Sequence, residues 1–111
     1  MTKRKIPENV KIIIEEAKKY LIKIYGKRLK GIILYGSYAR GDATNGSDID
    51  LILLLEEMID PVYEIDNISS EIHQLELKFN KLISIIPFDS NQYEKRRLPL
   101  ILNAKKEGII I

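Results

Sequence analysis

The chain has 111 residues, of which 45% are hydrophobic, and this length suits one compact domain with a modest core. Its 18 lysines and arginines are balanced by 16 aspartates and glutamates, so the formal net charge of +2 is not typical of a strongly basic nucleic-acid-binding protein. The absence of cysteine excludes disulfides, thiolate catalysis and cysteine-ligated zinc, and the single histidine excludes a histidine metal cluster.

Apolar runs such as residues 51–55 are far too short to cross a bilayer. The charged residues 1–5 are followed by Pro7 and Glu8, where a signal peptide would carry its apolar stretch. We therefore expect a soluble cytoplasmic protein with a single domain over residues 1–111.

The first predicted element is an amphipathic helix that begins near Pro7, because proline lacks the N–H group that would be unpaired in a first helical turn. Gly26 is expected to end this helix. A buried strand follows over residues 31–35 and stops at Gly36, and residues 37–47 predict one helical turn and then a tight turn. The apolar positions of the helix recur at helical spacing: Val10, Ile13, Ile14, Ala17, Leu21 and Ile24.

The middle of the chain predicts a second strand over residues 48–55, with a second helix after it. Asp60 is a candidate N-cap of that helix, and Pro61 is expected at its first position. The helix is expected to bury an apolar stripe made of Val62, Ile65, Ile68, Ile72 and Leu75.

A third strand is expected over residues 82–86, with Pro87 ending it. After it come a short helix capped by residue 89 or 90, a helix over residues 99–107 closed by Gly108, and an edge strand over residues 109–111. This order of elements predicts an α+β fold, in which a small mixed β-sheet carries helices packed on one face.

Two acidic residues stand at the start of the second strand. Residues two apart on a strand point to the same face, so Asp48 and Asp50 would project side by side, about 6.6 Å apart at the backbone. Such a pair can converge on two cations about 3.5–4 Å apart, the spacing of two-metal phosphoryl-transfer sites. Ile49 between them would point into the core. Because neighbouring carboxylates repel each other, a bound cation explains the pair better than a bare strand end.

The end of the first strand carries groups that suit a phosphate. Gly36 permits close approach of the backbone, and the N–H groups that follow it, with the hydroxyl of Ser37, would form an anion site. Arg40 lies about one turn further on and could add a bidentate contact to phosphate oxygens. Ser47 is expected to cap the turn before the second strand, and it could also touch a phosphate.

Gly36-Ser37, a ten-residue spacer and Asp48-Ile49-Asp50 resemble the signature of the DNA polymerase β-like nucleotidyltransferase superfamily. Residues 36–41 and 47–51 are similar to the motifs of its minimal nucleotidyltransferase (MNT) group. The resemblance implies the nucleotidyltransferase fold, ATP as substrate, and two Mg²⁺ ions held by catalytic Asp48 and Asp50. It also implies an antitoxin that transfers AMP to a hydroxyl, such as that of a tyrosine, of a partner HEPN-domain ribonuclease toxin.

The sequence departs from the superfamily at its third carboxylate. The third strand has no acid, and Ser84 is its one polar residue. Since a general base typically contributes about 10²–10⁴-fold, its absence would slow transfer without abolishing it. Two alternatives to the transferase antitoxin therefore stay open: a module that neutralises the partner by binding alone, and a small-molecule nucleotidyltransferase of the antibiotic-modifying type. Direct nucleic-acid binding is not expected, and a homo- or hetero-oligomer is left open.

Overall fold

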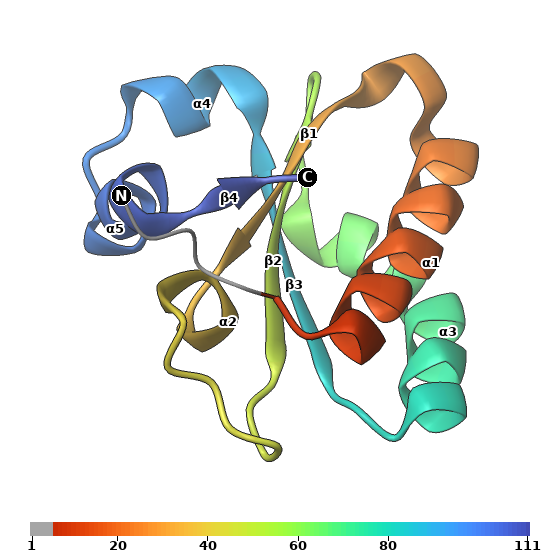
Figure 1. Cartoon of the computed structure of the whole chain (residues 1–111). Helices are drawn as coiled ribbons and strands as arrows, with labels where there is room; N and C mark the ends of the chain where they lie inside the picture. Colours follow the sequence, from red (N-terminus) through yellow and green to blue (C-terminus); the bar gives the residue numbers. More distant parts are fainter. Residues whose placement is uncertain (1–5) are drawn as a thin grey trace.

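A four-stranded sheet with the order β3-β2-β1-β4 lies at the centre of the computed structural model, which describes residues 6–111 (Figure 1). The charged residues 1–5 lie outside the described residues. β1 is antiparallel to both β2 and β4, whereas β2 and β3 are parallel, so the sheet is mixed as predicted. The strands are β1 (Leu29–Tyr35), β2 (Ile49–Leu55), β3 (Ile83–Asp89) and β4 (Ile109–Ile110).

The helices begin where the sequence places their first residues. Asp60 caps α3 by accepting a 3.0 Å hydrogen bond from the Val62 N–H, and Asp89 caps α4 by accepting from two backbone N–H groups. Within residues 6–111, no helix is long and apolar enough to span a membrane. The helical segments are α1 (Glu8–Tyr25), the 3₁₀ turn η1 (Gly26–Arg28), α2 (Ser37–Arg40), α3 (Pro61–Phe79), α4 (Ser90–Lys95) and α5 (Pro99–Glu107).

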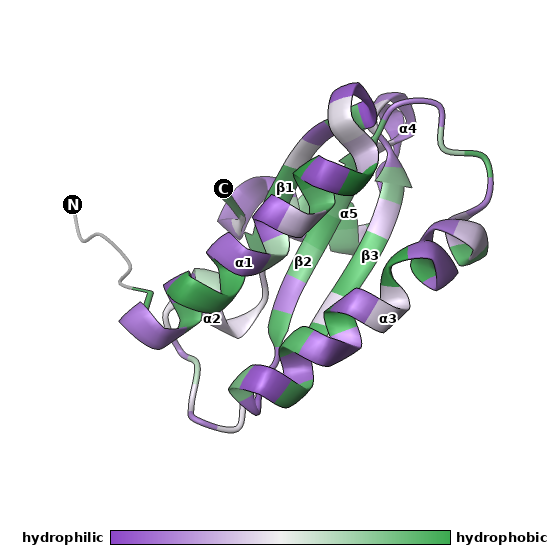
Figure 2. Cartoon of the chain, turned by 90° about the vertical axis from the view of Figure 1, so that its right-hand side faces the viewer, coloured by the Kyte–Doolittle hydropathy of each residue, from purple (hydrophilic) through white to green (hydrophobic). Residues whose placement is uncertain are grey.

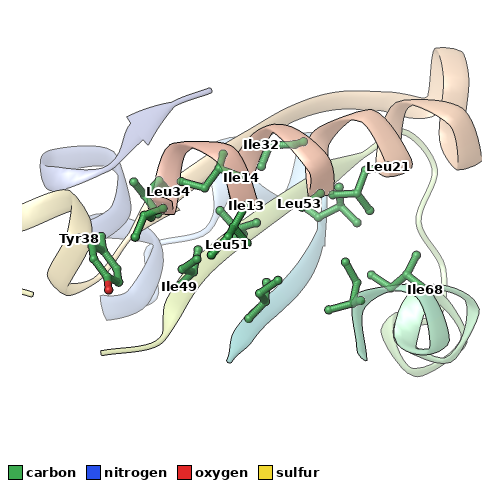
Figure 3. Packing of buried hydrophobic residues seen from close by; sticks show 14 of the residues in the cluster. Ile13, Ile14, Leu21, Ile32, Leu34, Tyr38, Ile49, Leu51, Leu53 and Ile68 are labelled. Carbon is green, nitrogen blue, oxygen red and sulfur yellow. The ribbon is translucent and has the colours of Figure 1, made fainter. Parts of the chain in front are cut away.

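The main core lies between one face of the sheet and the helices α1 and α3. Figure 2 looks onto this face and shows the two helices in front of strands that are hydrophobic for most of their length. Alternate residues of β2 point into this core, including Ile49 and Leu51, each 1% exposed. Tyr38 of α2 closes one end of the cluster, near Leu34 and Ile49 (Figure 3).

The prediction that helices pack on one face holds for the long helices and needs a correction for the short ones. α4 and α5 cover the opposite face of the sheet (Figure 1). The reason is that the central strands are apolar on both sides. Ile33 and Ile52 point away from the main core, so other side chains must pack on them to bury them from solvent. A second, smaller cluster provides it, in which they contact Tyr93, Ile101 and Ala104.

Several strand boundaries differ from the prediction, and three of the differences bear on the site or on the edge of the sheet. β1 begins at Leu29, two residues early, directly after the turn η1. β2 begins at Ile49, so Asp48 lies just before the strand. β3 continues through Pro87 to Asp89, because it is an edge strand and the missing N–H of a proline costs no ladder bond on a free edge.

The predicted buried stripe of α3 is wrong at two positions. Val62 is 63% exposed and Ile65 is 42% exposed, whereas Glu64 is 3% exposed. Glu64 is buried because it has partners there. Its carboxylate accepts hydrogen bonds from Arg28 Nη2 at 3.0 Å and from the Tyr25 hydroxyl at 3.1 Å, which joins the end of α1 to the start of α3.

Candidate functional site

The carboxylate of Asp50 lies directly against Gly36, where β1 ends. β1 and β2 pair so that Tyr35 is opposite Asp50, which brings the next residue, Gly36, beside the Asp50 side chain. A methyl group on Gly36 would collide with Asp50 Oδ2 and would lie 3.2 Å from Asp50 Cγ. Gly36 also has φ 75° and ψ −154°, a backbone conformation that is essentially restricted to glycine. The chain therefore needs glycine here for two separate reasons.

Asp48 and Asp50 interact electrostatically, as their spacing predicts. Asp48 is exposed and Asp50 is half-buried. Burial, and then the negative charge of Asp48, raise the pKa of Asp50, while the positive charge of Arg40 lowers it. The pKa of Tyr35 is also raised, by burial and then by the charge of Asp50. The four side chains thus share one electrostatic environment at this end of the sheet.

The short helix α2 begins next to this pair of acids. Its first backbone bonds run from the N–H groups of Ala39 and Arg40 to the carbonyl of Gly36. The N–H groups of Ser37 and Tyr38 come before these and have no carbonyl partner within the turn. Amides in this position, together with the hydroxyl of Ser37, a half-buried residue, suit the oxygens of a phosphate.

Arg40 and Ser47 both have protein partners in the structure. Arg40 Nε lies 3.3 Å from Asp42 Oδ2, and Arg40 Nη1 lies 4.0 Å from Glu107 Oε2. The Arg40 side chain is exposed, and ion pairs of an exposed side chain are weak, so Arg40 can exchange them for a phosphate at low cost. Ser47 Oγ accepts a 2.9 Å hydrogen bond from the Thr44 N–H and caps the turn. A phosphate contact by either residue stays a prediction.

Ser84 occupies the position beside Asp50 on the neighbouring strand. β2 and β3 pair with Asp50 opposite Ser84, and laterally paired residues point to the same face of a sheet. Within residues 6–111, no group of three or more acidic or histidine side chains could hold a metal ion by itself. The two carboxylates nevertheless suit Mg²⁺, which proteins commonly hold through one or two carboxylates plus substrate phosphates.

A pocket of about 320 Å³ adjoins Gly36 and extends to α5. The sequence reasoning missed this contribution of α5, because the helix lies more than sixty residues along the chain and carries no recognisable motif. It also missed Lys81, whose ammonium group contacts α2 and the turn before β2. The pocket is lined by Tyr35, Gly36, Arg40, Leu100, Asn103, Ala104 and Glu107.

Residues 4–111 match the Nucleotidyltransferase domain family. The chain is 40% identical over 74 residues to "Putative protein adenylyltransferase MJ0141" of Methanocaldococcus jannaschii, which covers 67% of this chain and 74% of that protein. A second protein of the same organism, "Putative protein adenylyltransferase MJ0604", is 39% identical over 72 residues, which covers 65% of this chain and 66% of that protein.

Two solved structures show the same fold at low sequence identity. A toxin-antitoxin structure with AMP-PNP superposes with a TM-score of 0.59 and 19% identity, covering 86% of this chain and 70% of that chain. A mutant of the MntA-HpeT toxin-antitoxin superposes with a TM-score of 0.58 and 20% identity, covering 87% of this chain and 70% of that chain.

Proposed function

This chain belongs to the Nucleotidyltransferase domain family, and on that basis we propose that it binds ATP with Mg²⁺ and transfers AMP to a hydroxyl group of a partner protein. The observation that carries the proposal is the contact between the Asp50 carboxylate and Gly36. It brings the group that would hold a cation next to the backbone that would hold phosphates, so that one nucleotide can engage both.

Each side chain of the site has a proposed role. Asp48 and Asp50 would hold two Mg²⁺ ions, which would neutralise the phosphate oxygens and act as Lewis acids toward them. The N–H groups at the start of α2, with Ser37, would bind the phosphates. Arg40 would leave its ion pairs with Asp42 and Glu107 and add its guanidinium to the phosphate oxygens.

The transfer exchanges one bond to phosphorus for another. The acceptor oxygen bonds to the α-phosphorus, the bond from that phosphorus to the bridging oxygen breaks, and pyrophosphate leaves. The hydroxyl proton passes to solvent, because the serine beside Asp50, Ser84, is not a base at neutral pH. We expect slow turnover for this reason, by about 10²–10⁴-fold relative to a site with a general base.

The pocket beside Gly36 offers room for the nucleoside part of ATP. Its walls combine apolar surface from Leu100 and Ala104 with the ring of Tyr35 and the amide of Asn103. This mixture of apolar surface and a few polar groups is typical of small-molecule sites. The pocket therefore supports a nucleotide that spans from α2 to α5.

The proposed acceptor is a tyrosine of a HEPN-domain ribonuclease toxin, which this chain would silence as its antitoxin. Support comes from two relatives named as protein adenylyltransferases and from the fold shared with toxin-antitoxin structures.

The test is the intact mass of the partner after co-purification with this chain, in the presence of ATP and Mg²⁺. Wild type should add one or more AMP units, whereas the variant with Asp48→Asn and Asp50→Asn should add none. A matched control is Asp66→Asn, which removes an exposed carboxylate on α3. A partner that never gains AMP in the presence of the wild-type chain would contradict transfer.

A second candidate is a module that neutralises the partner by binding alone, and the serine beside Asp50 favours it. Under this alternative the double asparagine variant would still bind and neutralise the toxin. Loss of neutralisation by a variant that is folded and still binds the partner would rule this alternative out.

A further inference from the structure

Lys81 lies in the short connection between α3 and β3, and its ammonium group makes three hydrogen bonds to the turn before β2 and to α2. Lys81 Nζ donates to the Tyr38 hydroxyl at 2.8 Å, to the Asn45 carbonyl at 2.9 Å and to the Ser47 carbonyl at 3.2 Å. It also lies 5.3 Å from the centre of the Tyr38 ring. An ammonium group has three donors, so these acceptors use its full capacity.

The three acceptors belong to two segments that the proposed site must hold together. Tyr38 is part of α2, is only 5% exposed, and donates its own hydroxyl hydrogen to the Thr44 carbonyl at 3.4 Å. Asn45 and Ser47 belong to the turn over residues 44–47, which closes on itself through a 3.0 Å bond from the Ser47 N–H to the Thr44 carbonyl. Lys81 therefore ties the proposed phosphate-binding turn to the segment that carries Asp48.

Asp48 is held on both sides by two consecutive residues of the α3–β3 connection. The Ser47 carbonyl before it accepts from Lys81, and the Ile49 N–H after it donates to the Leu82 carbonyl at 2.9 Å. The side chain of Asp48 is exposed, so the position of its carboxylate depends on these backbone anchors. Leu82 acts through its main chain, so Lys81 supplies the side-chain anchor from this connection.

We propose that Lys81 is a positioning residue that fixes the Asp48 carboxylate relative to the Gly36–Ser37 backbone, and so controls metal-dependent nucleotide binding. The inference rests on the proposed function, because it assigns Asp48 to Mg²⁺. Removing a group that orients a metal ligand typically costs about 10–100-fold in metal affinity or activity. We expect a loss of that size when the ammonium is removed.

The experiment measures the dissociation constant of an ATP analogue with an α,β-methylene bridge, with Mg²⁺ and with EDTA, at a temperature where every variant is folded. Lys81→Met keeps most of the side-chain length and removes the charge. It should weaken binding about 10–100-fold with Mg²⁺ and leave binding in EDTA unchanged, because Gly36 and Ser37 are intact.

Lys78→Met is the matched control, three residues away. Lys78 Nζ also makes a hydrogen bond, to Glu16 at 3.2 Å, and lies 5.1 Å from the centre of the Phe79 ring, but it contacts no residue of the site. Its variant should bind like wild type. If Lys81→Met and Lys78→Met bind the magnesium-bound analogue equally well, Lys81 does not position Asp48. If the wild type shows no magnesium-dependent binding, the proposed function itself fails.

Two further variants keep the test decisive if Lys81→Met does not fold. Tyr38→Phe removes only one of the three acceptors and should weaken magnesium-dependent binding about 2–10-fold. Wild-type affinity in Tyr38→Phe would overturn the proposal in that case. Lys81→Arg, in a folded protein, should bind the magnesium-bound analogue more weakly than wild type, because a planar guanidinium cannot direct three donors as an ammonium does. Wild-type affinity in Lys81→Arg would overturn the proposal, because it would show that the three directed hydrogen bonds do not position Asp48.

Discussion

Replacing Gly36 with alanine tests the geometry of the site most directly. The backbone there has φ 75° and ψ −154°, and holding a non-glycine residue in such a region costs about 1–3 kcal/mol. The added methyl group would also collide with Asp50 Oδ2, and over-packing of this kind typically lowers stability by a further amount of about 1–3 kcal/mol. We expect the free energy of unfolding to fall by about 2–6 kcal/mol, out of the 5–15 kcal/mol or so that holds a domain together.

Two other glycines serve as controls that separate the cost of backbone strain from the cost of the collision with Asp50. Gly26 has φ 52° and ψ −123° with nothing within 4 Å of the place where a Cβ would lie, so Gly26→Ala should cost only the backbone strain of about 1–3 kcal/mol. Gly46 meets only Thr44 Oγ1, at 4.0 Å, and its φ is not positive. Gly46→Ala should therefore be neutral or stabilise the chain by up to about 1 kcal/mol. Urea unfolding at a constant m-value would measure all three.

Asp50 could relieve the collision by rotating away from residue 36, which would recover part of the stability. The carboxylate would then leave the site, so Gly36→Ala should lose magnesium-dependent binding of the ATP analogue even if the fold is only mildly weakened. Gly26→Ala should keep that binding. A Gly36→Ala protein that binds the magnesium-bound analogue as tightly as wild type would refute the reasoning, because it would show that the contact with Asp50 does not matter.

Three further predictions concern Ser84, Asp50 and Arg28. Ser84→Asp would place a third acid beside Asp50 and should raise the initial rate of AMP transfer by up to about 10²–10⁴-fold; an unchanged rate would contradict the register-based placement. The pKa of Asp50 is higher in the folded chain than its ordinary value of 3.8, so ionisation of Asp50 destabilises the metal-free fold as the pH rises above 3.8. Asp50→Asn removes this effect and should raise the Tm at neutral pH. The difference in Tm between the variant and wild type should become smaller as the pH is lowered. Arg28→Met leaves the buried carboxylate of Glu64 with only the Tyr25 hydroxyl as a partner, and urea unfolding should show a loss of stability of about 1.5–3 kcal/mol. Lys30→Met breaks the exposed 3.7 Å ion pair with Glu56 and should lower stability by less than about 1 kcal/mol.

The parts of the site that sequence could predict are those whose geometry is set by neighbours in the chain. Strand periodicity is enough to put Asp48 and Asp50 on the side opposite Ile49, and the structure shows Ile49 in the core. Glycine at the end of a buried strand predicts a place where another group can approach the backbone closely, and in the structure the Asp50 carboxylate lies against Gly36. Local rules of this kind do not depend on knowing which segment packs against which.

The features that sequence could not predict depend on such packing. In the sequence, nothing distinguishes Lys81 from the exposed lysines, because its hydrogen-bond partners lie 34 to 43 residues away in the chain. Glu64 interrupts an apolar stripe and is buried only because Arg28 and Tyr25 meet it there. Pro87 is acceptable inside β3 only because that strand lies at the edge of the sheet. Each of these three positions depends on a segment that is distant in the sequence, and residue spacing does not predict which segment that is.

The small number of acidic ligands implies an order of binding. The negative charges of Asp48 and Asp50 attract a cation, but two carboxylates supply only part of the octahedral oxygen shell of Mg²⁺ and form a weak site for the bare ion. Mg²⁺ binds readily to phosphates and keeps several waters when a protein offers it only one or two acids. The phosphates of ATP would therefore complete the coordination that the chain leaves unfinished, and the ion should enter with the nucleotide. Titration with Mg²⁺ alone should then give a dissociation constant well above that measured with the ATP analogue present, and tight binding of Mg²⁺ alone would show that further ligands are in place.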